Sequence, residues 1–124
     1  MTRILLLEDN ADMLTMLAQV LEWGGHEVIM GRDGLEGIEI LENSDLPPTV
    51  IISDLSMPDM DGIEFLQHLR STPEWADMPY VIMSAHSSPE DRRRALSAGA
   101  DDFLVKPFNL DDFQKVLQRW EIPE

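Results

Sequence analysis

Short apolar runs and amphipathic segments alternate along the whole chain. The apolar runs are rich in Leu, Ile and Val. Their length and composition predict strands at 3–7, 26–30, 49–53, 79–85 and 102–106. Between and after them, apolar residues recur every three or four positions. This spacing predicts helices within 10–25, 33–43, 62–70, 88–99 and 109–120.

Side-chain spacing within the second predicted helix adds detail. Asp33 and Glu36 are separated as in a capping box, in which each side chain accepts a hydrogen bond from the other's backbone amide. The apolar residues of this helix recur at helical spacing. We therefore expect Leu35, Ile38 and Leu41 to face the core.

The order of the elements indicates an α/β fold in which helices cover both faces of a parallel sheet. No linker, internal repeat or low-complexity tract interrupts the 124 residues, so we expect one domain over 1–124 and no output domain. In open parallel sheets, ligands bind beyond the carboxyl ends of the strands, where strand order reverses. Polar residues at those ends are the candidates for a functional site.

Polar residues stand at or just beyond the ends of four predicted strands. They are Glu8, Asp9, Asp54, Ser84 and Lys106. In the predicted fold they meet in one cleft, where the carboxylates repel one another unless a cation neutralises them. A hard divalent ion such as Mg²⁺ binds through one or two carboxylates and a substrate phosphate, and Lys106 adds a mobile positive charge.

These groups suit phosphoryl transfer to a carboxylate. A carboxylate oxygen acts as the nucleophile, while the cation and the lysine neutralise charge on the transferred group. Asp54 is the predicted nucleophile because it ends the central strand, between the acidic pair and Lys106. A strand-end cap is the alternative interpretation of Asp54, and an ordinary loop serine is the alternative for Ser84.

The composition narrows the partners and the compartment. The formal net charge is −15, so we expect no direct binding of nucleic acid, whose phosphates would be repelled. No apolar run approaches the roughly 20 residues that cross a bilayer, and we expect a cytoplasmic protein with no membrane contact. Without cysteine, disulfides and thiolate chemistry are excluded. The basic run at 92–94 is interpreted as a solvated helix face, with a docking surface as the alternative.

Four motifs together resemble a known family. They are LLLEDN, ISDLSMPDMDG, VIMSAH and DDFLVKPF, in that order along the chain. In sequence and spacing they are similar to the receiver domains of two-component response regulators, from about Arg3 to Trp120. The resemblance implies the flavodoxin-like (βα)5 receiver fold, with a five-stranded parallel sheet in the order 2-1-3-4-5.

The resemblance also implies roles for the acidic residues. Asp54 matches the phosphorylated aspartate of the family. Asp9 matches a direct ligand of Mg²⁺, for which Mn²⁺ is an alternative, and Glu8 matches its neighbour, which acts through water. Ser56 matches the position whose backbone carbonyl completes the metal site.

Further matches concern the switch. Ser84 matches the hydroxyl residue that turns toward the phosphoryl group, and Lys106 matches the lysine that pairs with that group. Phe103 matches the aromatic residue that moves inward. Ser84 is often threonine in the family and Phe103 often tyrosine, so this chain departs from the commonest pattern there. Ser56 and His86 match positions that tune the lifetime of the phosphoryl group.

The implied function is a phosphorylation-operated switch. A histidine kinase or a histidine phosphotransfer protein donates the phosphoryl group, and the face formed by 88–99, 102–106 and 109–120 then binds an output partner or a second copy of the chain. The receiver catalyses only its own phosphorylation and dephosphorylation and is not otherwise an enzyme. Two alternatives are a binding module that works without phosphorylation and a hydrolase of the haloacid-dehalogenase-like kind. The latter class requires an aspartate where Ser56 stands.

Overall fold

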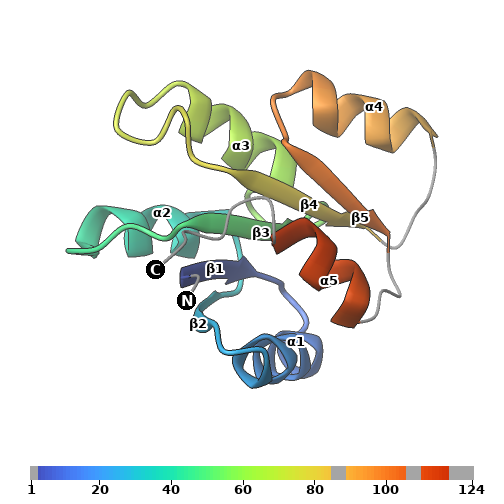
Figure 1. Ribbon diagram of the computed structural model, residues 1–124. Coiled ribbons are helices and arrows are strands. Elements are labelled where there is room, and N and C mark those ends of the chain that lie inside the picture. Colours follow the sequence, from blue (N-terminus) through green and yellow to red (C-terminus); the bar gives the residue numbers. More distant parts are fainter. Residues whose placement is uncertain (1–2, 85–88, 106–109, 118–124) are drawn as a thin grey trace.

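The computed structural model describes residues 3–84, 89–105 and 110–117. Over these residues strands and helices alternate as the sequence predicts (Figure 1). The elements are β1 (Arg3–Leu7), α1 (Ala11–Trp23), β2 (Glu27–Gly31), α2 (Gly34–Asn43), β3 (Val50–Asp54), α3 (Gly62–Arg70), β4 (Tyr80–Ser84), α4 (Pro89–Ser97), β5 (Asp102–Val105) and α5 (Leu110–Leu117). No helix within these ranges is long and apolar enough to cross a bilayer.

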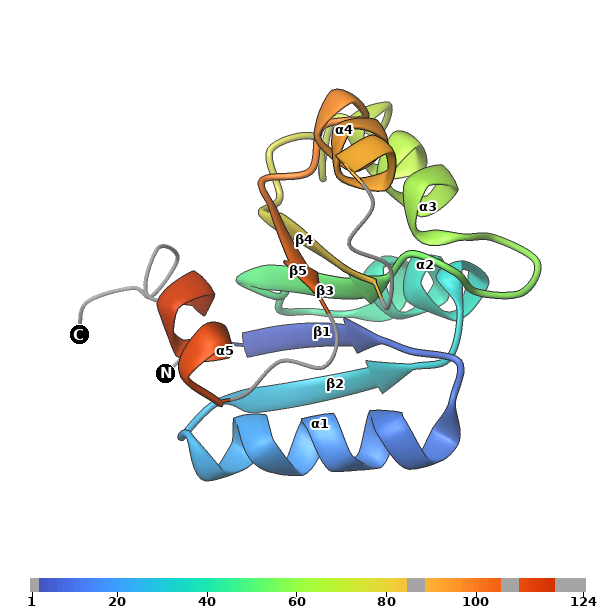
Figure 2. The same ribbon diagram turned by 90° about the vertical axis from the view of Figure 1, so that its right-hand side faces the viewer.

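The five strands form one parallel sheet in the order β2-β1-β3-β4-β5, which confirms the predicted fold. β3 is central, and every residue in it is buried, as expected for an interior strand covered on both faces. From β1 the chain passes to α1 on one face of the sheet, and from β3 to α3 on the other (Figure 2). Strand order therefore reverses between β1 and β3, and ligand sites of such folds lie at this point.

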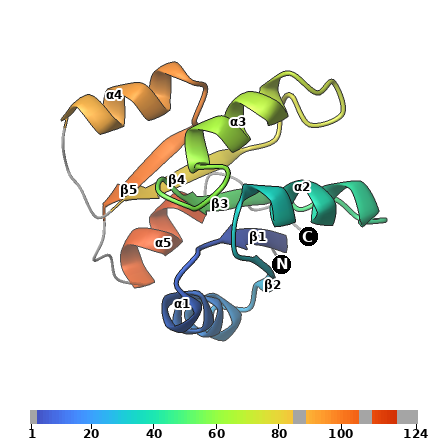
Figure 3. The ribbon, with the colours of Figure 1, turned by 180° about the vertical axis from the view of Figure 1, so that it is seen from behind.

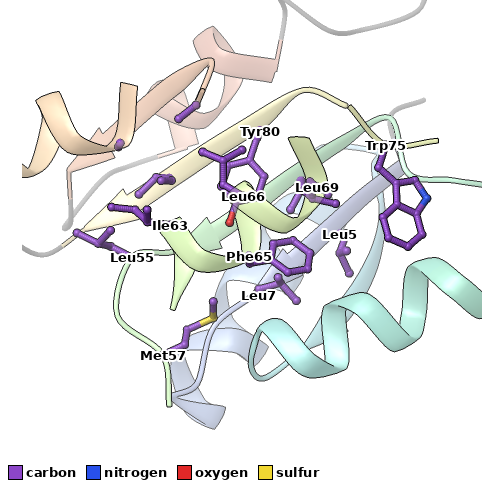
Figure 4. Packing of buried hydrophobic residues seen from close by; sticks show 14 of the residues in the cluster. Leu5, Leu7, Leu55, Met57, Ile63, Phe65, Leu66, Leu69, Trp75 and Tyr80 are labelled. Carbon is purple, nitrogen blue, oxygen red and sulfur yellow. The ribbon is translucent and has the colours of Figure 1, made fainter. Parts of the chain in front are cut away.

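Helices cover both faces of the sheet: α1 and α5 lie on one face, and α2, α3 and α4 lie on the other (Figures 1 and 3). Alternate residues of β1 supply the two faces, because successive side chains of a strand point in opposite directions. The cluster beneath α1 includes Ile4, Leu6, Leu14, Leu17, Leu21, Val50 and Ile52. The cluster beneath α3 includes Leu5, Leu7, Ile51, Phe65, Leu66, Leu69, Trp75 and Tyr80 (Figure 4).

Side-chain caps fix the starts of the two helices nearest the carboxyl ends of β1 and β3. Asn10 accepts a hydrogen bond at 3.0 Å from the amide of Met13 in the first turn of α1. Asp61 accepts hydrogen bonds at 2.9 and 2.8 Å from the amides of Ile63 and Glu64. The Glu64 side chain accepts in turn from the Asp61 amide at 3.3 Å, which completes a capping box.

One expectation for α2 was wrong. Asp33 does cap this helix, accepting a hydrogen bond at 2.8 Å from the amide of Glu36. Of the three residues expected to face the core, Leu41 is buried and Ile38 packs against the cluster beneath α3, whereas Leu35 is 52% exposed. The helix lies close to its neighbour through a glycine instead, because a Cβ at Gly37 would come within 2.9 Å of the ring of Phe65. A larger residue at position 37 would hold α2 farther from Phe65.

At the amino edge of the sheet, Arg70 joins three segments of the chain. Its guanidinium donates hydrogen bonds at 3.1 and 2.8 Å to the carbonyls of Ala76 and Met78. It also donates at 2.8 Å to the carbonyl of Gly99 and forms an ion pair at 3.2 Å with Asp101. The last residue of α3 thereby holds the turn before β4 and the turn before β5 together.

Candidate functional site

Three carboxylates meet at the carboxyl edge of the sheet. One oxygen from each of Glu8, Asp9 and Asp54 lies within 4.8 Å of the others. Glu8 is 1% exposed and Asp54 is 8% exposed, whereas Asp9 is open to solvent. The structure therefore brings these three acids together, as the sequence predicted.

Strand pairing explains why these acids lie together. Leu7 pairs with Ser53 in the parallel register of β1 and β3, so the next residue of each chain segment, Glu8 or Asp54, stands at the same level. The amide of Glu8 donates to the carbonyl of Gly31 at 3.1 Å, which extends the ladder one step beyond β1. A bend then begins, and these backbone contacts fix the depth of the Glu8 carboxylate.

The loop from β3 to α3 closes tightly behind Asp54. The amide of Leu55 donates to the carbonyl of Met83 at 2.8 Å, and the amide of Gly62 donates to the carbonyl of Leu55 at 2.9 Å. Any Cβ at Gly62 would collide with the carbonyl oxygen of Asp54, so this position requires glycine. Asp59, at the tip, has a φ of 66°, which makes it part of the turn itself.

Of the predicted switch residues, the structure describes two. Ser84 is the last residue of β4, 2% exposed, and stands one residue beyond Met83, the partner of Asp54 in the register. Phe103 is buried in β5 at 6% exposure and belongs to the cluster beneath α3. Lys106 and His86 lie outside the described residues, and their roles stay predictions.

A cavity of about 570 Å³ opens beside the carboxylates. Its wall is formed by Asp9, the loop after Asp54, and the side of α4. The lining residues are Asp9, Leu55, Ser56, Met57, Pro58, Asp61, Asp91 and Arg94. The Arg94 guanidinium lies 3.6 Å from the Asp91 carboxylate. It is a positive charge in a lining that also holds the carboxylates of Asp9, Asp61 and Asp91.

The sequence did not single out Asp91 and Arg94 for the site, because both belong to α4 and only packing brings α4 to the cavity. The run at 92–94 is exposed, in agreement with the predicted solvated face. Arg94 nevertheless faces the cavity at the same time. Helical spacing could have suggested this, since Asp91 and Arg94 are three residues apart and share a side of the helix.

The donor set suits a hard divalent cation. Three carboxylates with oxygens this close favour a bound positive charge, because their mutual repulsion falls when a cation lies between them. All the donors are oxygens, which are the ligands Mg²⁺ prefers, and the open cavity leaves room for water or a phosphate. The residues present therefore fit such an ion.

Comparison with known proteins agrees with this geometry. The family model described as the response regulator receiver domain matches residues 4–118. The KDP operon transcriptional regulatory protein KdpE of Escherichia coli (strain K12) is 39% identical over 118 residues, covering 95% of this chain and 50% of the relative. Response regulator MprA of Mycobacterium sp. (strain KMS) is 36% identical, covering 89% of this chain and 46% of the relative. The chain thus spans about half the length of these curated relatives.

Solved structures show the same architecture. The chemotaxis response regulator CheY4 of Vibrio cholerae has a TM-score of 0.87 at 32% identity, with 98% of this chain and 99% of that chain covered. The receiver domain of sensor histidine kinase PA1611 from Pseudomonas aeruginosa PAO1 has a TM-score of 0.86 at 30% identity, with 96% of each chain covered. That structure is described as having a magnesium ion coordinated in the active site cleft.

Proposed function

The chain belongs to the response regulator receiver family, and on that premise we propose that it is a phosphorylation-operated signalling switch with Asp54 as the phosphoacceptor. The observation that carries this proposal is the meeting of Glu8, Asp9 and Asp54 at the point where strand order reverses. A buried carboxylate at the end of the central strand, beside two further acids, has little structural value, because burying charge is costly. It has value as a nucleophile held in a cation site.

We assign the metal site to the same residues. Asp9 and Asp54 would bind Mg²⁺ directly, Glu8 would bind it through water, and the backbone carbonyl of Ser56 would complete the set; Mn²⁺ is an alternative ion. When bound, the ion neutralises negative charge on the carboxylates and on an incoming phosphoryl group. The exposure of Asp9 and the cavity beside Ser56 leave that group a route of approach.

The proposed reaction transfers a phosphoryl group from a phosphohistidine to Asp54. A carboxylate oxygen of Asp54 forms a bond to phosphorus as the phosphorus–nitrogen bond of the donor breaks, and the imidazole keeps the electron pair and takes up a proton. Lys106 pairs with the transferred group in this proposal. Water later cleaves the acyl phosphate, so the domain catalyses only its own phosphorylation and dephosphorylation.

The signal is a change in conformation that the phosphoryl group stabilises. Ser84 stands one residue beyond the level of Asp54, where its hydroxyl can turn toward the phosphoryl group, and Phe103 repacks in response. Phosphorylation shifts the population only because it interacts more favourably with one conformation than with the other. The surface of α4, β5 and α5 then changes its affinity for a partner.

We propose three kinds of protein partner. The donor is a histidine kinase or a histidine phosphotransfer protein, and the receiver of the signal is an output protein or domain. The third is a second copy of the chain, joined through the same surface after phosphorylation. Relatives named as transcriptional regulators are about twice as long as this chain, which fits an output module beyond the matched region of those relatives. We place this signalling in the cytoplasm, without direct contact to nucleic acid or membrane.

Two alternatives predict different outcomes. A binding module independent of phosphorylation would bind its partner equally well with and without the modification. A hydrolase of the haloacid-dehalogenase-like kind would need an aspartate at position 56, where this chain has serine, and would turn over generic phosphate esters.

The test is an intact-mass spectrum after incubation with acetyl phosphate, with and without Mg²⁺. We expect one added phosphoryl group on the native chain in Mg²⁺ and none on Asp54→Asn. Asp59→Asn is the matched control, because Asp59 is an exposed acid in the same loop, and it should label like the native chain. Labelling of Asp54→Asn would contradict the proposal, as would failure of the native chain to bind beryllofluoride when no adduct forms.

A further inference from the structure

Two hydroxyl groups lie within the apolar cluster beneath α3. Ser53 and Tyr80 are both 0% exposed, and Ser53 immediately precedes Asp54 in β3. Figure 4 shows the Tyr80 side chain beneath α3, close to Leu66, with its phenolic oxygen inside the cluster. An apolar side chain would fill this space without the cost of burying a hydroxyl, so the polar groups call for an explanation.

The phenol of Tyr80 connects β4 to the loop behind Asp54. Its hydroxyl donates a hydrogen bond at 2.8 Å to the carbonyl of Gly62, the first residue of α3. Gly62 in turn lies against the carbonyl oxygen of Asp54, and its amide is hydrogen-bonded to Leu55 at 2.9 Å. One side chain thus holds the residue that closes the 55–61 loop onto the phosphoacceptor strand.

Ser53 reaches the same place from β3. Its hydroxyl donates at 3.0 Å to the carbonyl of Asp54 and lies 4.0 Å from the sulfur of Met57, inside the loop. Burial raises the pKa of Tyr80, so the phenol keeps its proton and donates it to the carbonyl of Gly62. The pair therefore contacts both ends of the loop.

The other end of Tyr80 is fixed as well. Its backbone amide donates at 2.9 Å to the carboxylate of Asp101, the same group that pairs with Arg70. The ring packs against Phe65, with the two centroids 5.9 Å apart. A side chain held at its backbone, ring and hydroxyl has little rotational freedom, so its hydroxyl can set the position of Gly62 rather than follow it.

We propose that Tyr80, with Ser53, is a positioning residue for the site: the two hydroxyls hold the 55–61 loop so that the Asp54 carboxylate and the Ser56 carbonyl converge on a divalent cation. This inference deepens the proposed function and rests on it for the identity of the ion. The Tyr80 hydroxyl contacts the carbonyl of Gly62, and the Ser53 hydroxyl contacts the carbonyl of Asp54 and the sulfur of Met57. Their effect reaches the site through Gly62 and the backbone of Asp54.

The inference predicts that removing one hydroxyl weakens cation binding without unfolding the chain. Tyr80→Phe keeps the ring and loses one hydrogen bond, and Ser53→Ala removes the second hydroxyl. Ile4→Val is the matched control, because Ile4 is 0% exposed in the cluster beneath α1 and the change removes one buried methylene group far from the 55–61 loop. All three variants should lose similar stability, and only the first two should lose site geometry.

Two measurements are made on each full-length variant without any phosphodonor. Calorimetric titration with Mg²⁺ gives the dissociation constant, and amide hydrogen exchange by NMR gives the opening of the hydrogen bond from Gly62 to Leu55. For Tyr80→Phe and Ser53→Ala we expect both the dissociation constant and the Gly62 exchange rate to rise about threefold to tenfold. For Ile4→Val we expect less than about a twofold change in either.

An unchanged dissociation constant in Tyr80→Phe would overturn the inference, and so would an equal rise in Ile4→Val, which would show an effect of stability alone. The hydrogen-exchange measurement keeps this test separate from that of the proposed function. If the native chain bound no Mg²⁺, the proposed function would fail. Faster Gly62 exchange in Tyr80→Phe but not in Ile4→Val would then still support the positioning of the loop.

Discussion

The amino and carboxyl edges of the sheet differ in how their charged groups are paired. At the amino edge, the Arg70 guanidinium is surrounded by acceptors: three backbone carbonyls and the carboxylate of Asp101. At the carboxyl edge, three carboxylates of the same sign lie within 4.8 Å of one another. The first arrangement is complete within the chain, whereas in the proposed function a cation from solution balances the second. Structural and functional charges can be told apart by this difference.

The contrast concerns energy as well as geometry. A charge that is hydrogen-bonded on all sides stabilises the fold, and its removal leaves several polar groups without their partner. Like charges gathered in a cleft reduce stability until a ligand neutralises them, which is common at functional sites. Tyr80 links the edges, since its amide binds Asp101 and its hydroxyl binds Gly62.

The largest effect is expected from breaking the amino edge. Arg70→Met keeps much of the apolar stem but removes the guanidinium, and it should lower the free energy of unfolding by about 3 kcal/mol because carbonyls of two turns lose a charged donor. Urea denaturation measures this change. Arg94→Met is the control: Arg94 is 57% exposed and, among the residues that the structure describes, pairs with Asp91, so its loss should cost less than about 0.5 kcal/mol. An equal loss of unfolding free energy in Arg70→Met and Arg94→Met would contradict the difference between the two edges.

The next effect comes from distorting the carboxyl edge without changing its charge. Gly62→Ala places a methyl group against the carbonyl of Asp54 and should cost about 2 kcal/mol through overpacking, with a large loss of Mg²⁺ affinity. The substitution Gln67→Ala, at an exposed position of the same helix, should leave both quantities nearly unchanged. Thermal unfolding and Mg²⁺ titration report the two quantities. Normal Mg²⁺ binding by Gly62→Ala would show that the loop adapts and that close packing there is not required.

Neutralising one of the three carboxylates is expected to raise the free energy of unfolding, whereas the two preceding substitutions lower it. Without divalent ions, Asp54→Asn should be more stable than the native chain by about 1 kcal/mol, because one of three repelling charges is gone. Adding Mg²⁺ should stabilise the native chain more than the variant, since a ligand that binds only the folded state raises its stability. Urea midpoints with and without Mg²⁺ give both differences. Asp59→Asn should match the native chain in both comparisons. A loss of stability in metal-free Asp54→Asn would contradict the expected repulsion among the three carboxylates.

The smallest effect appears only at alkaline pH. Burial raises the pKa of Tyr80 above its ordinary value near 10, whereas the unfolded chain titrates at about 10. The folded state holds the proton more tightly, so this contribution to stability is complete below about pH 10 and declines as the pH rises further. Tyr80 is the only tyrosine, so its ultraviolet absorbance reports its ionisation directly. We expect the Tyr80 phenol to ionise only as the chain unfolds. Ionisation near pH 10 in the folded chain would show that the phenol is exposed to solvent instead of buried.

The sequence was informative wherever one local pattern determined the outcome. Apolar runs of strand length predicted β1 and β3, and the acids directly after β1 and at the end of β3 had to share an edge once the strands were parallel. The cap by Asp33 was predicted from spacing alone and is present. These features depend on neighbours in the chain, or on the single rule that parallel strands end at the same edge.

Features that depend on tertiary packing were not predictable in this way. Leu35 was expected to face the core with Ile38 and Leu41, but the inward side of α2 runs through Gly34, Gly37 and Leu41, and Leu35 lies outside it. Arg94 reaches the cavity only because α4 packs beside the 55–61 loop. In the sequence, Tyr80 occupies a position that an apolar strand residue could equally fill. Its contact with Gly62, 18 residues away, therefore cannot be predicted from the neighbouring residues.

The central claim is that the carboxyl edge holds a phosphoacceptor at Asp54. The most direct test incubates the native chain with acetyl phosphate and Mg²⁺, reduces the acyl phosphate with borohydride, and locates the reduced residue by peptide mass spectrometry. We predict homoserine at position 54 in Mg²⁺ and none without it, with Asp9, Asp59 and Asp61 unchanged. Reduction at one of those aspartates in place of Asp54 would contradict the account, because the acids would then be a metal site without the proposed nucleophile.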